Sequence, residues 1–353
     1  MPVDPPNGRR EVTVTDVAAA AKVSKATAAR VLGGYGAVSE AVRDRVQTAA
    51  EQLGYHPNAL AKTMNTGRSN SIGIVVGDIE NPFFAQATRG AADVAKAAGY
   101  DLILLNADED ADAEQNAISV LLAKRVDGIL VAPASTTDPS SLREAVDRAR
   151  PLVLFDRVAD GLDVDTIVAD NVDGARRLTG LLLDAGHRRV AFVSTIAHPD
   201  GYRVGERLGS SSVDDRVTGF VGALHDAGVT DPARYVRLNA RRDGVDAIVR
   251  SLVDEGVTAI VASDSLIAQA AFRTLRALGR DIPGDVSLVA FDDADWTSLS
   301  APAITVMSQP IHEIGAEAAR LLVRRIAGDR APTEHLVLPQ RLIERESIAP
   351  PRG

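Results

Sequence analysis

The sequence lacks cysteine, an apolar stretch in residues 1–10 and any long apolar run, and each absence argues against a class of protein. Without cysteine among the 353 residues, neither a disulfide framework nor a thiolate metal site can form, which suits a reducing cytoplasm. No apolar run approaches the ~20 residues that a membrane span needs, so no membrane partner is expected. Residues 1–10 contain no apolar h-region, so we expect a cytoplasmic rather than a secreted protein.

The motifs of nucleotide and acid–base chemistry are also missing. No phosphate-binding loop and no dinucleotide glycine fingerprint follows the first predicted strand, at 72–76. The six histidines are scattered, and neither a histidine nor a nucleophile stands at a predicted strand end. Asp292 and Asp293 could by themselves suggest acid–base work or a metal. Because they have no such neighbours, we expect no enzyme, no cofactor and no metal.

Charge is divided unevenly along the chain. Residues 1–70 hold nine Lys/Arg against six Asp/Glu, a net of +3, and the remaining residues hold 30 against 42, a net of −12. A mildly basic head on an acidic body is typical of nucleic-acid contact confined to the head.

The head, residues 11–57, is predicted to be helical, after a proline-rich tail at 1–10 that we expect to be disordered. Thr15 can cap a helix at 16–21, Ser24 a second at 25–32, and Ser39 a third at 40–53 that Gly54 ends. The first two helices, joined by a turn at Lys22-Val23, form a helix-turn-helix. The predicted core positions are Val17, Ala20, Ala21, Val23, Ala28, Val31, Leu32, Val42, Val46, Ala49, Ala50 and Leu53.

The second helix has the composition of a DNA-reading helix. Lys25, Ala26 and Arg30 face away from the predicted core, so this helix could enter a major groove. Ser24 and Thr27 can reach phosphates, and Arg30 can offer a bidentate fork to a guanine edge. From the helix pattern alone, an ordinary small helical domain remains an equal alternative.

A short helix is predicted between the head and the body. Asn58 can cap about two turns over 58–65, which end in polar residues. Two turns do not recover the nucleation cost of a helix, which takes roughly 12 to 15 residues, so the segment should order only when something else holds it. A frayed linker helix is the alternative.

The body, from Ser71, predicts two doubly wound parallel-sheet α/β lobes. The predicted strands are 72–76, 101–105, 128–131, 152–155, 166–169, 189–193, 235–238, 259–262, 286–291, 303–310, 334–338 and 341–347. The predicted helices are 88–98, 112–124, 139–149, 172–186, 213–227, 242–254, 264–278 and 311–327.

Ligands in such sheets bind beyond the carboxyl ends of the strands, so two facing lobes form a cleft. Carboxylates accept hydrogen bonds from hydroxyls and aromatic faces stack on sugar rings, so a sugar site is indicated. The candidate residues that follow strands are Asp78, Phe83, Phe84, Asp170, Ser263, Asp264, Asp292 and Trp296.

Each candidate also has an ordinary structural interpretation. Phe83 could be core packing, Asp264 a helix cap, and Arg216, within Asp215-Arg216-Val217, a surface ion-pair partner.

The motifs that carry a family resemblance are Thr13-Val14-Thr15-Asp16-Val17-Ala18, Val23-Ser24-Lys25-Ala26-Thr27, Arg30-Val31-Leu32, Val38-Ser39, Leu53-Gly54-Tyr55, Pro57-Asn58 and Leu60-Ala61. With these motifs, the sequence resembles the LacI/GalR family of bacterial transcription regulators along the whole chain. It implies that Lys25 and Ala26 read bases and that Thr13, Thr15, Tyr55, Asn58 and Ala61 are further DNA contacts. The family usually has a leucine where Met64 stands, inserted into the minor groove of a pseudo-palindromic operator.

The resemblance also implies a small-molecule effector, gripped by Arg216, and a homodimer, with a tetramer left open. The first helices of the two lobes would form the dimer interface, and the chain would cross between lobes three times. Three departures stand out: Lys22 replaces a common glycine in the turn, Ala28-Ala29 replaces Val-Ser, and Met64 replaces leucine. The loop 195–212 is longer than expected and places Ser210 and Ser212 where some relatives have Arg and Thr; we expect it to act as a lid.

We therefore predict a disordered tail (1–10), a headpiece (11–57), a hinge (58–70), a first lobe (71–165 plus 302–331) and a second lobe (166–301 plus 332–349). The predicted function is a sequence-specific DNA-binding transcription regulator, expected to be a repressor, whose operator affinity is controlled by a sugar or sugar derivative bound between the two lobes. A sugar-binding module of periplasmic type, without a DNA role, is the alternative, and a sugar kinase would need the missing phosphate loop.

Overall fold

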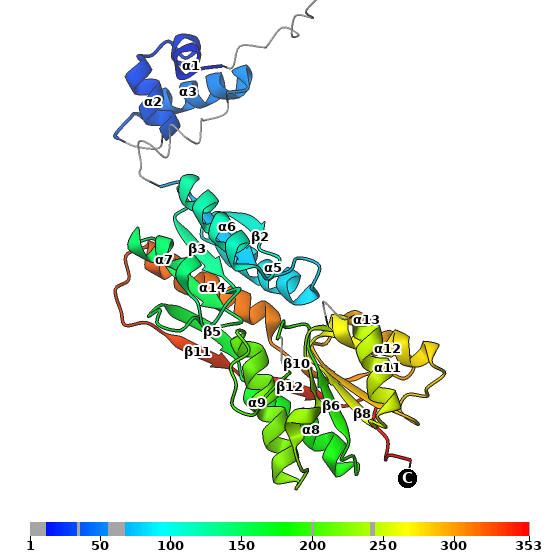
Figure 1. Cartoon of the computed structure of the whole chain (residues 1–353). Helices are drawn as coiled ribbons and strands as arrows, with labels where there is room; N and C mark the ends of the chain where they lie inside the picture. The colour runs from blue at the N-terminus through cyan, green and yellow to red at the C-terminus, as the bar shows by residue number, and fades with distance from the viewer. Residues whose placement is uncertain (1–11, 34–35, 56–67, 199–200, 241–243, 353) are drawn as a thin grey trace, which may run out of the picture. The chain divides into compact units, whose positions relative to one another are not determined.

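The computed structural model describes residues 12–33, 36–55, 68–198, 201–240 and 244–352. They belong to two compact units, Met1–Ser69 and Asn70–Gly353, each with its own core (Figure 1). The predicted tail at 1–10 and hinge helix at 58–65, and with it Asn58, Ala61 and Met64, lie outside the described residues.

The first unit contains three helices, α1 (Val14–Ala20), α2 (Lys25–Gly33) and α3 (Glu40–Leu53), as predicted. Two predicted core residues are exposed instead. Ala20 lies on the outer face of α1, and Leu53, in the last turn of α3, is 39% exposed. The buried core consists of Val17, Ala18, Ala21, Ala28, Val46, Ala49 and Ala50.

The first helix begins at Val14, capped by Thr13, so the prediction that Thr15 caps it is wrong. The Asp16 carboxylate accepts hydrogen bonds from both the Thr13 backbone N (2.8 Å) and the Thr13 hydroxyl (2.7 Å). Thr13 and Thr15 are equally good caps by type, and the partner three residues later decides between them.

The turn of the helix-turn-helix is left-handed at Lys22, with φ of 54°. A residue with a Cβ costs roughly 1 kcal/mol there, which is the cost that the sequence predicts for a non-glycine. Ser24 caps α2 as predicted, since its Oγ accepts from the Thr27 backbone N at 3.1 Å.

The second unit holds two six-stranded sheets. The first, in the order β11-β5-β4-β3-β1-β2, contains β1 (Ser71–Val76), β2 (Asp101–Asn106), β3 (Gly128–Val131), β4 (Leu152–Phe155), β5 (Asp165–Ala169) and β11 (His335–Leu338). The second, in the order β12-β10-β9-β8-β6-β7, contains β6 (Val190–Val193), β7 (Val236–Arg237), β8 (Ala259–Ala262), β9 (Ser287–Phe291), β10 (Thr305–Ser308) and β12 (Arg341–Ile343). The strands pair in parallel, except that β12 is antiparallel to β10.

Helices cover both faces of each sheet (Figure 1). The first lobe has α5 (Pro82–Ala97) and α14 (Ile311–Ile326) on one face and α6 (Ala111–Ala123) and α7 (Ser140–Asp147) on the other. The second has α8 (Asn171–Asp184) and α9 (Ser211–Asp226) on one face and α11 (Val245–Asp254) and α12 (Ser265–Ala277) on the other. A short 3₁₀ turn (Pro232–Tyr235) and α13 (Asp295–Leu299) complete it.

This double cover explains the unbroken apolar runs of the strands. On β1, Ile72, Ile74 and Val76 pack into the core beneath α5 and α14, while Val75 packs into the core beneath α6. Both sets of side chains are therefore buried.

The chain crosses between the lobes three times, after β5, after β10 and after β11, as the family resemblance implies. The predicted lobe boundaries are wrong in three places. Strand β5, at 165–169, belongs to the first sheet and does not begin the second lobe, and β10, at 305–308, belongs to the second sheet. Strand β11, at 335–338, pairs with β5 in the first sheet, although the sequence predicts 332–349 as part of the second lobe. A buried parallel strand has the same residue pattern in either sheet, so periodicity cannot assign it.

Two glycines let α5 and α14 cross closely in the first lobe. A Cβ at Gly315 would lie 1.8 Å from the Ala87 carbonyl oxygen, and a Cβ at Gly90 would lie 2.0 Å from the His312 carbonyl oxygen. Side chains at either position would push the two helices apart.

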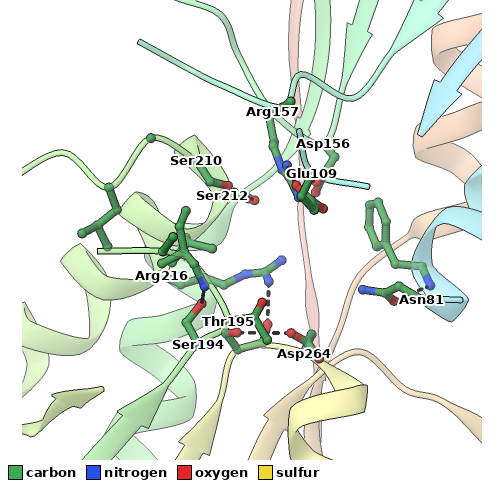
Figure 2. Close-up of a pocket in the computed structure, with 18 of the residues that line it drawn as sticks. Asn81, Glu109, Asp156, Arg157, Ser194, Thr195, Ser210, Ser212, Arg216 and Asp264 are labelled. Carbon is green, nitrogen blue, oxygen red and sulfur yellow. Dashed lines mark hydrogen bonds and ion pairs between the residues drawn. The ribbon is translucent and has the colours of Figure 1, made fainter. Parts of the chain in front are cut away.

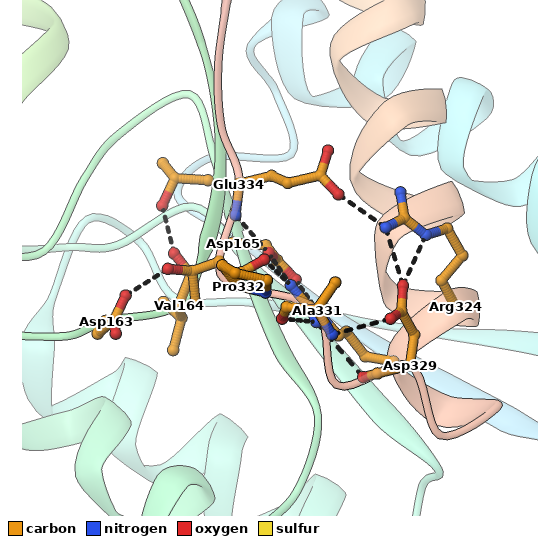
Figure 3. A network of polar contacts seen from close by, with 11 residues as sticks. Asp163, Val164, Asp165, Arg324, Asp329, Ala331, Pro332 and Glu334 are labelled. Carbon is orange, nitrogen blue, oxygen red and sulfur yellow. Dashed lines mark hydrogen bonds and ion pairs between the residues drawn. The ribbon is translucent and has the colours of Figure 1, made fainter.

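A polar network ties the end of α14 to the start of β11 (Figure 3). Arg325 forms two hydrogen bonds with Asp165, at 2.6 and 2.7 Å, and also donates to the carbonyls of Ala331 and Pro332. Arg324 joins Asp329 and Glu334, at 2.8 and 2.7 Å. The network fixes the loop that returns the chain to the edge of the first sheet beside β5. No helix in the described ranges is both long and apolar enough to cross a membrane.

Candidate effector cleft and DNA-binding face

A cavity of about 480 Å³ opens between the two lobes, where strand ends of both sheets face each other (Figure 2). Residues following β1, β2, β3 and β4 line it from the first lobe, and residues following β6 to β10 line it from the second. It therefore lies at the carboxyl ends of both sheets, where ligands of such folds bind.

Four residues that line the cavity have left-handed backbones despite carrying side chains. They are Glu109, Asp156, Asn239 and Asp292, with φ of 58°, 66°, 63° and 70°. Each lies one to three residues after a strand, and the reversed backbone turns the chain there. Asp and Asn tolerate this conformation better than other residues with a Cβ, and such backbones concentrate at functional sites.

Arg216, from α9, is buried and held by neutral acceptors. Its Nε donates to the Asn171 Oδ1 at 2.8 Å and its Nη1 to the Ser263 carbonyl at 2.7 Å. The guanidinium lies over the Phe291 ring, 4.4 Å from the centroid. It is thus fixed in place beside the cavity.

Three aspartates beside the cavity are costly to ionise. Burial raises the pKa of Asp292 to about 6, against the opposing effect of the Arg216 charge and a hydrogen bond from Gln309 Nε2 at 2.6 Å. Burial also raises the pKa of Asp156 and of Asp264. Carboxylates in this condition gain from hydroxyl donors that a ligand brings.

The first lobe contributes a second arginine, Arg157, paired with Glu109. Arg157 Nη2 donates to Glu109 Oε1 at 2.8 Å, Nη1 also bonds Glu109 Oε2, and Nη1 reaches the Pro133 carbonyl at 3.2 Å. Its Nε lies 3.2 Å from Asp156 Oδ2. Among the described residues, the cavity wall therefore combines four carboxylates with two guanidiniums and contains no lysine or histidine.

In the headpiece, the predicted DNA-reading side chains form an outward face. Lys25, Ala26 and Arg30 are exposed on α2, and Ser24 lies exposed at its start. The Ser24 and Thr27 hydroxyls are 2.8 Å apart.

Comparison with known proteins matches both units to one family. A model described as "Bacterial regulatory proteins, lacI family" matches residues 13–58, and one described as "Periplasmic binding proteins and sugar binding domain of LacI family" matches 69–346. The chain belongs to the LacI family. It is accordingly a DNA-binding transcription regulator of this family, whose members are regulators and not enzymes. The alternative of a sugar-binding module without a DNA role is thereby excluded.

The relatives of this LacI-family regulator match over nearly their full length. The HTH-type transcriptional regulator DegA of Bacillus subtilis is 31% identical, covering 96% of this chain and 99% of its own. CelR of Thermobifida fusca is 33% identical, covering 96% and 99%. Among solved structures, a CelR–cellobiose complex has a TM-score of 0.69 at 30% identity, covering 96% of this chain and 100% of its own. A Lac repressor dimer on its operator, at 23% identity, has a TM-score of 0.81 and supports the fold.

Six of the effector residues predicted from sequence line the cavity of the LacI-family regulator: Phe83, Phe84, Arg216, Ser263, Asp264 and Asp292. Two of them are also structural, as the alternatives suggested. Asp264 caps α12 by accepting from the backbone N of Leu266 and of Ile267, each at 2.9 Å. Phe83 is buried against Phe84, with ring centroids 5.3 Å apart. Arg216 is not a surface ion-pair residue.

Three predicted effector residues do not line the cavity, so their prediction as effector contacts is corrected. Asp78 accepts from the Glu80 backbone N at 2.9 Å in the loop after β1. Asp170 caps α8 by accepting from the Asp173 N at 3.1 Å. Trp296 packs against Phe272, 6.1 Å between centroids, in the second-lobe core. A residue after a strand can as readily cap the next helix or turn outward, which spacing alone does not reveal.

On the headpiece of the LacI-family chain, Thr15 is exposed and Tyr55 half-buried. Thr13 is exposed, but its hydroxyl is engaged by Asp16. Asn58, Ala61 and Met64 fall outside the described residues, so their role remains a prediction.

The loop predicted as a lid meets the first lobe through an interlobe clasp, defined here as Thr136, Asp160, Arg207, Gly209 and Ser211. The Thr136 N donates to the Gly209 carbonyl and the Thr136 Oγ1 accepts from the Ser211 N, both at 2.8 Å. Ser211 Oγ accepts from the Val158 N at 2.9 Å, and Arg207 pairs with Asp160 at 3.2 Å. Ser210 and Ser212 line the cavity beside the clasp, and the role of this loop as a lid stays a prediction.

Sequence reasoning missed several lining residues, among them Glu109, Asp156, Arg157, Asn239 and Gln309. Asp156 and Arg157 directly follow a predicted strand, so the same rule that found Asp292 would have found them. Glu109 lies three residues beyond β2, and only its left-handed backbone, invisible in the sequence, brings it to Arg157.

Proposed function

We propose that this LacI-family regulator is a repressor whose operator affinity is set by a sugar or sugar derivative bound in the cleft. The observation that carries the proposal is a cavity with buried carboxylates around a fixed arginine, in one chain with an exposed recognition helix. Relatives support it: a CelR structure is a complex with cellobiose, one from Enterococcus faecium is with bound ribose, and another relative is a ribose operon repressor.

The cleft offers the hydrogen-bond partners that sugar hydroxyls need. Asp156, Asp264 and Asp292 can accept hydroxyl hydrogens, and Arg216 can donate to a ring or hydroxyl oxygen. Gln309 Oε1 is buried without a partner among the described residues, which is an unusual state that a ligand hydroxyl would relieve. Phe83 and Phe84 supply apolar surface for the C–H face of the ring.

Control of DNA binding follows from linkage between cleft and headpiece. If the ligand and the DNA prefer different angles between the lobes, each lowers the affinity for the other by the same factor. A tenfold factor corresponds to about 1.4 kcal/mol. We propose that the angle acts on the hinge at 58–65, which orders in the minor groove when two chains pair on a pseudo-palindromic operator in the cytoplasm. Met64 would be the inserted residue.

The test combines DNA selection with a sugar panel. Full-length protein would select fragments from a genomic DNA pool, and anisotropy titrations on the selected site would be repeated with neutral sugars, including ribose and cellobiose. We expect a defined sequence preference and a sugar that changes the apparent Kd at least fivefold. Binding without preference over random DNA would refute the regulator model, and a preference unchanged by every sugar would refute the effector class.

Arg30→Ala gives a residue-level test of the recognition helix. Loss of a base contact should weaken specific binding by about 5- to 150-fold, from the 1–3 kcal/mol that a bidentate contact contributes. Arg148→Ala, which removes an exposed arginine paired with Glu144 on the body, is the control and should stay near the wild-type Kd. Equal Kd values for both variants would exclude Arg30 from DNA recognition.

A further inference from the structure

The arginine that the first lobe contributes to the cleft, Arg157, is already paired with a carboxylate, that of Glu109. Arg157, with only 10% of its side chain exposed, is gripped by both carboxylate oxygens of Glu109. It also contacts the Pro133 carbonyl, Asp156 and the ring of Phe84. A bidentate carboxylate fills the fork geometry with which an arginine would bind a phosphate or a carboxylate.

The position of Glu109 is built into the backbone. Asp108 and Glu109 are consecutive left-handed residues, with φ of 53° and 58°, and the Glu109 N donates to the Gly77 carbonyl at 3.0 Å. A Cβ at Gly77 would lie 2.3 Å from Glu109 Oε1, so the carboxylate occupies space that only glycine leaves open. Two strained residues and a glycine converge on placing this one charge.

The second arginine does not replace Arg157 as an anion receptor. Arg216 spends its Nε and Nη1 on Asn171 and on the Ser263 carbonyl, and the nearby carboxylates of Asp264 and Asp292 compensate its charge. With four carboxylates and two guanidiniums among the residues of the wall that the structure describes, an entering anion meets an excess of like charge in a buried site.

We propose that Glu109 is a specificity-determining residue that neutralises Arg157, so that the cleft accepts uncharged polyhydroxylated ligands and rejects phosphorylated or carboxylated ones. The inference rests on the proposed function only in taking this cavity as the effector site. Removing the Glu109 charge leaves the two Nη groups of Arg157 without their carboxylate partner, so that a phosphate can take the place of the Glu109 carboxylate on this guanidinium.

The test uses full-length Glu109→Gln, which keeps the side-chain shape and removes the charge. Binding of ribose, ribose 5-phosphate and inorganic phosphate would be measured by thermal shift and calorimetry, with sodium chloride matching the ionic strength. Wild type should show no saturable response to either phosphate compound. Glu109→Gln should bind inorganic phosphate and ribose 5-phosphate at least tenfold more tightly than wild type does.

Two further variants separate this effect from a general change in charge or fold. Glu144→Gln removes a carboxylate of equal exposure, 30%, that pairs with Arg148 away from the cavity, and it should behave as wild type. Gly77→Ala keeps every charge but displaces the Glu109 carboxylate, and it should gain phosphate binding as Glu109→Gln does. If Glu109→Gln unfolds, Gly77→Ala carries the test.

Two results would overturn the proposal: saturable binding of ribose 5-phosphate to wild type, or phosphate affinity in both cavity variants equal to that of wild type and Glu144→Gln. The operator titrations report separately on the proposed function. A gain of phosphate binding without any sugar effect on DNA would keep the charge filter and refute the effector role. If a sugar changes operator affinity but neither cavity variant gains phosphate binding, the effector role is kept and the charge filter is refuted.

Discussion

Asp292→Asn should make the unliganded protein more stable at neutral pH, although it removes a cavity-lining residue. Burial raises the pKa of Asp292 to about 6 in the folded chain, against an ordinary value of 3.8. The folded state therefore holds a proton that the unfolded chain releases between these pH values, and stability falls as pH rises through that window. At about 1.4 kcal/mol per pH unit, the ionised carboxylate costs about 3 kcal/mol above pH 6.

Asparagine preserves the hydrogen bond and the backbone conformation of Asp292. Its Oδ1 can still accept from Gln309 Nε2, and it tolerates the left-handed backbone at this position, where φ is 70°. The gain should therefore approach about 3 kcal/mol at pH 7.5 and shrink toward zero near pH 4. The variant should bind the effector more weakly, because it loses a carboxylate that accepts hydrogen bonds from ligand hydroxyls. This carboxylate therefore favours ligand binding and lowers the stability of the unliganded protein.

Urea titrations at several pH values, followed by fluorescence of the single tryptophan, Trp296, measure the difference. Asp293→Asn is the matched control. Its carboxylate pairs with Arg345 at 2.6 Å and accepts from the Thr297 hydroxyl at 3.0 Å, so its removal should lower stability. The reasoning is refuted if Asp292→Asn is less stable than wild type at pH 7.5, or if its gain does not change with pH.

Two further predictions concern the packing that holds the lobes. Thr136→Val leaves the Ser211 N–H of the interlobe clasp without an acceptor, so effector binding should weaken by an amount equivalent to about 1–3 kcal/mol; an unchanged effector titration would show that the clasp does not matter for closure. Gly315→Ala places a methyl group 1.8 Å from the Ala87 carbonyl oxygen and should lower the free energy of unfolding by about 3 kcal/mol, seen as a lower urea midpoint. An unaltered midpoint would mean that α5 and α14 separate without cost.

Most of the fold could be predicted because its signals are local. The end of α3 at Gly54 and the strand at 128–131 each follow from residues within a few positions. The partner sheet of β5 and β10 could not, because a buried strand carries no record of its neighbours. The start of α1 depends on whether Thr13 or Thr15 caps the helix, and the hydrogen bonds from Thr13 to Asp16 show that it is Thr13.

The cleft was predictable where a side chain directly follows a strand, as at Asp292 and Ser263. The prediction went wrong at Asp170, whose position after β5 serves as a helix cap. Glu109 was out of reach for a different reason. Its role depends on two left-handed residues and a glycine contributed by another strand end, a convergence that no local pattern records.

The late return of the chain to the first lobe has a consequence for translation. Helix α14 and strand β11, at 311–338, complete a core and a sheet begun at residue 71. The emerging polypeptide can form the headpiece while it is still attached to the ribosome, since that core closes within residues 12–55. The first lobe must wait with exposed apolar strands until residue 338 has been synthesised, so this nascent intermediate is the stage at which a chaperone would be needed.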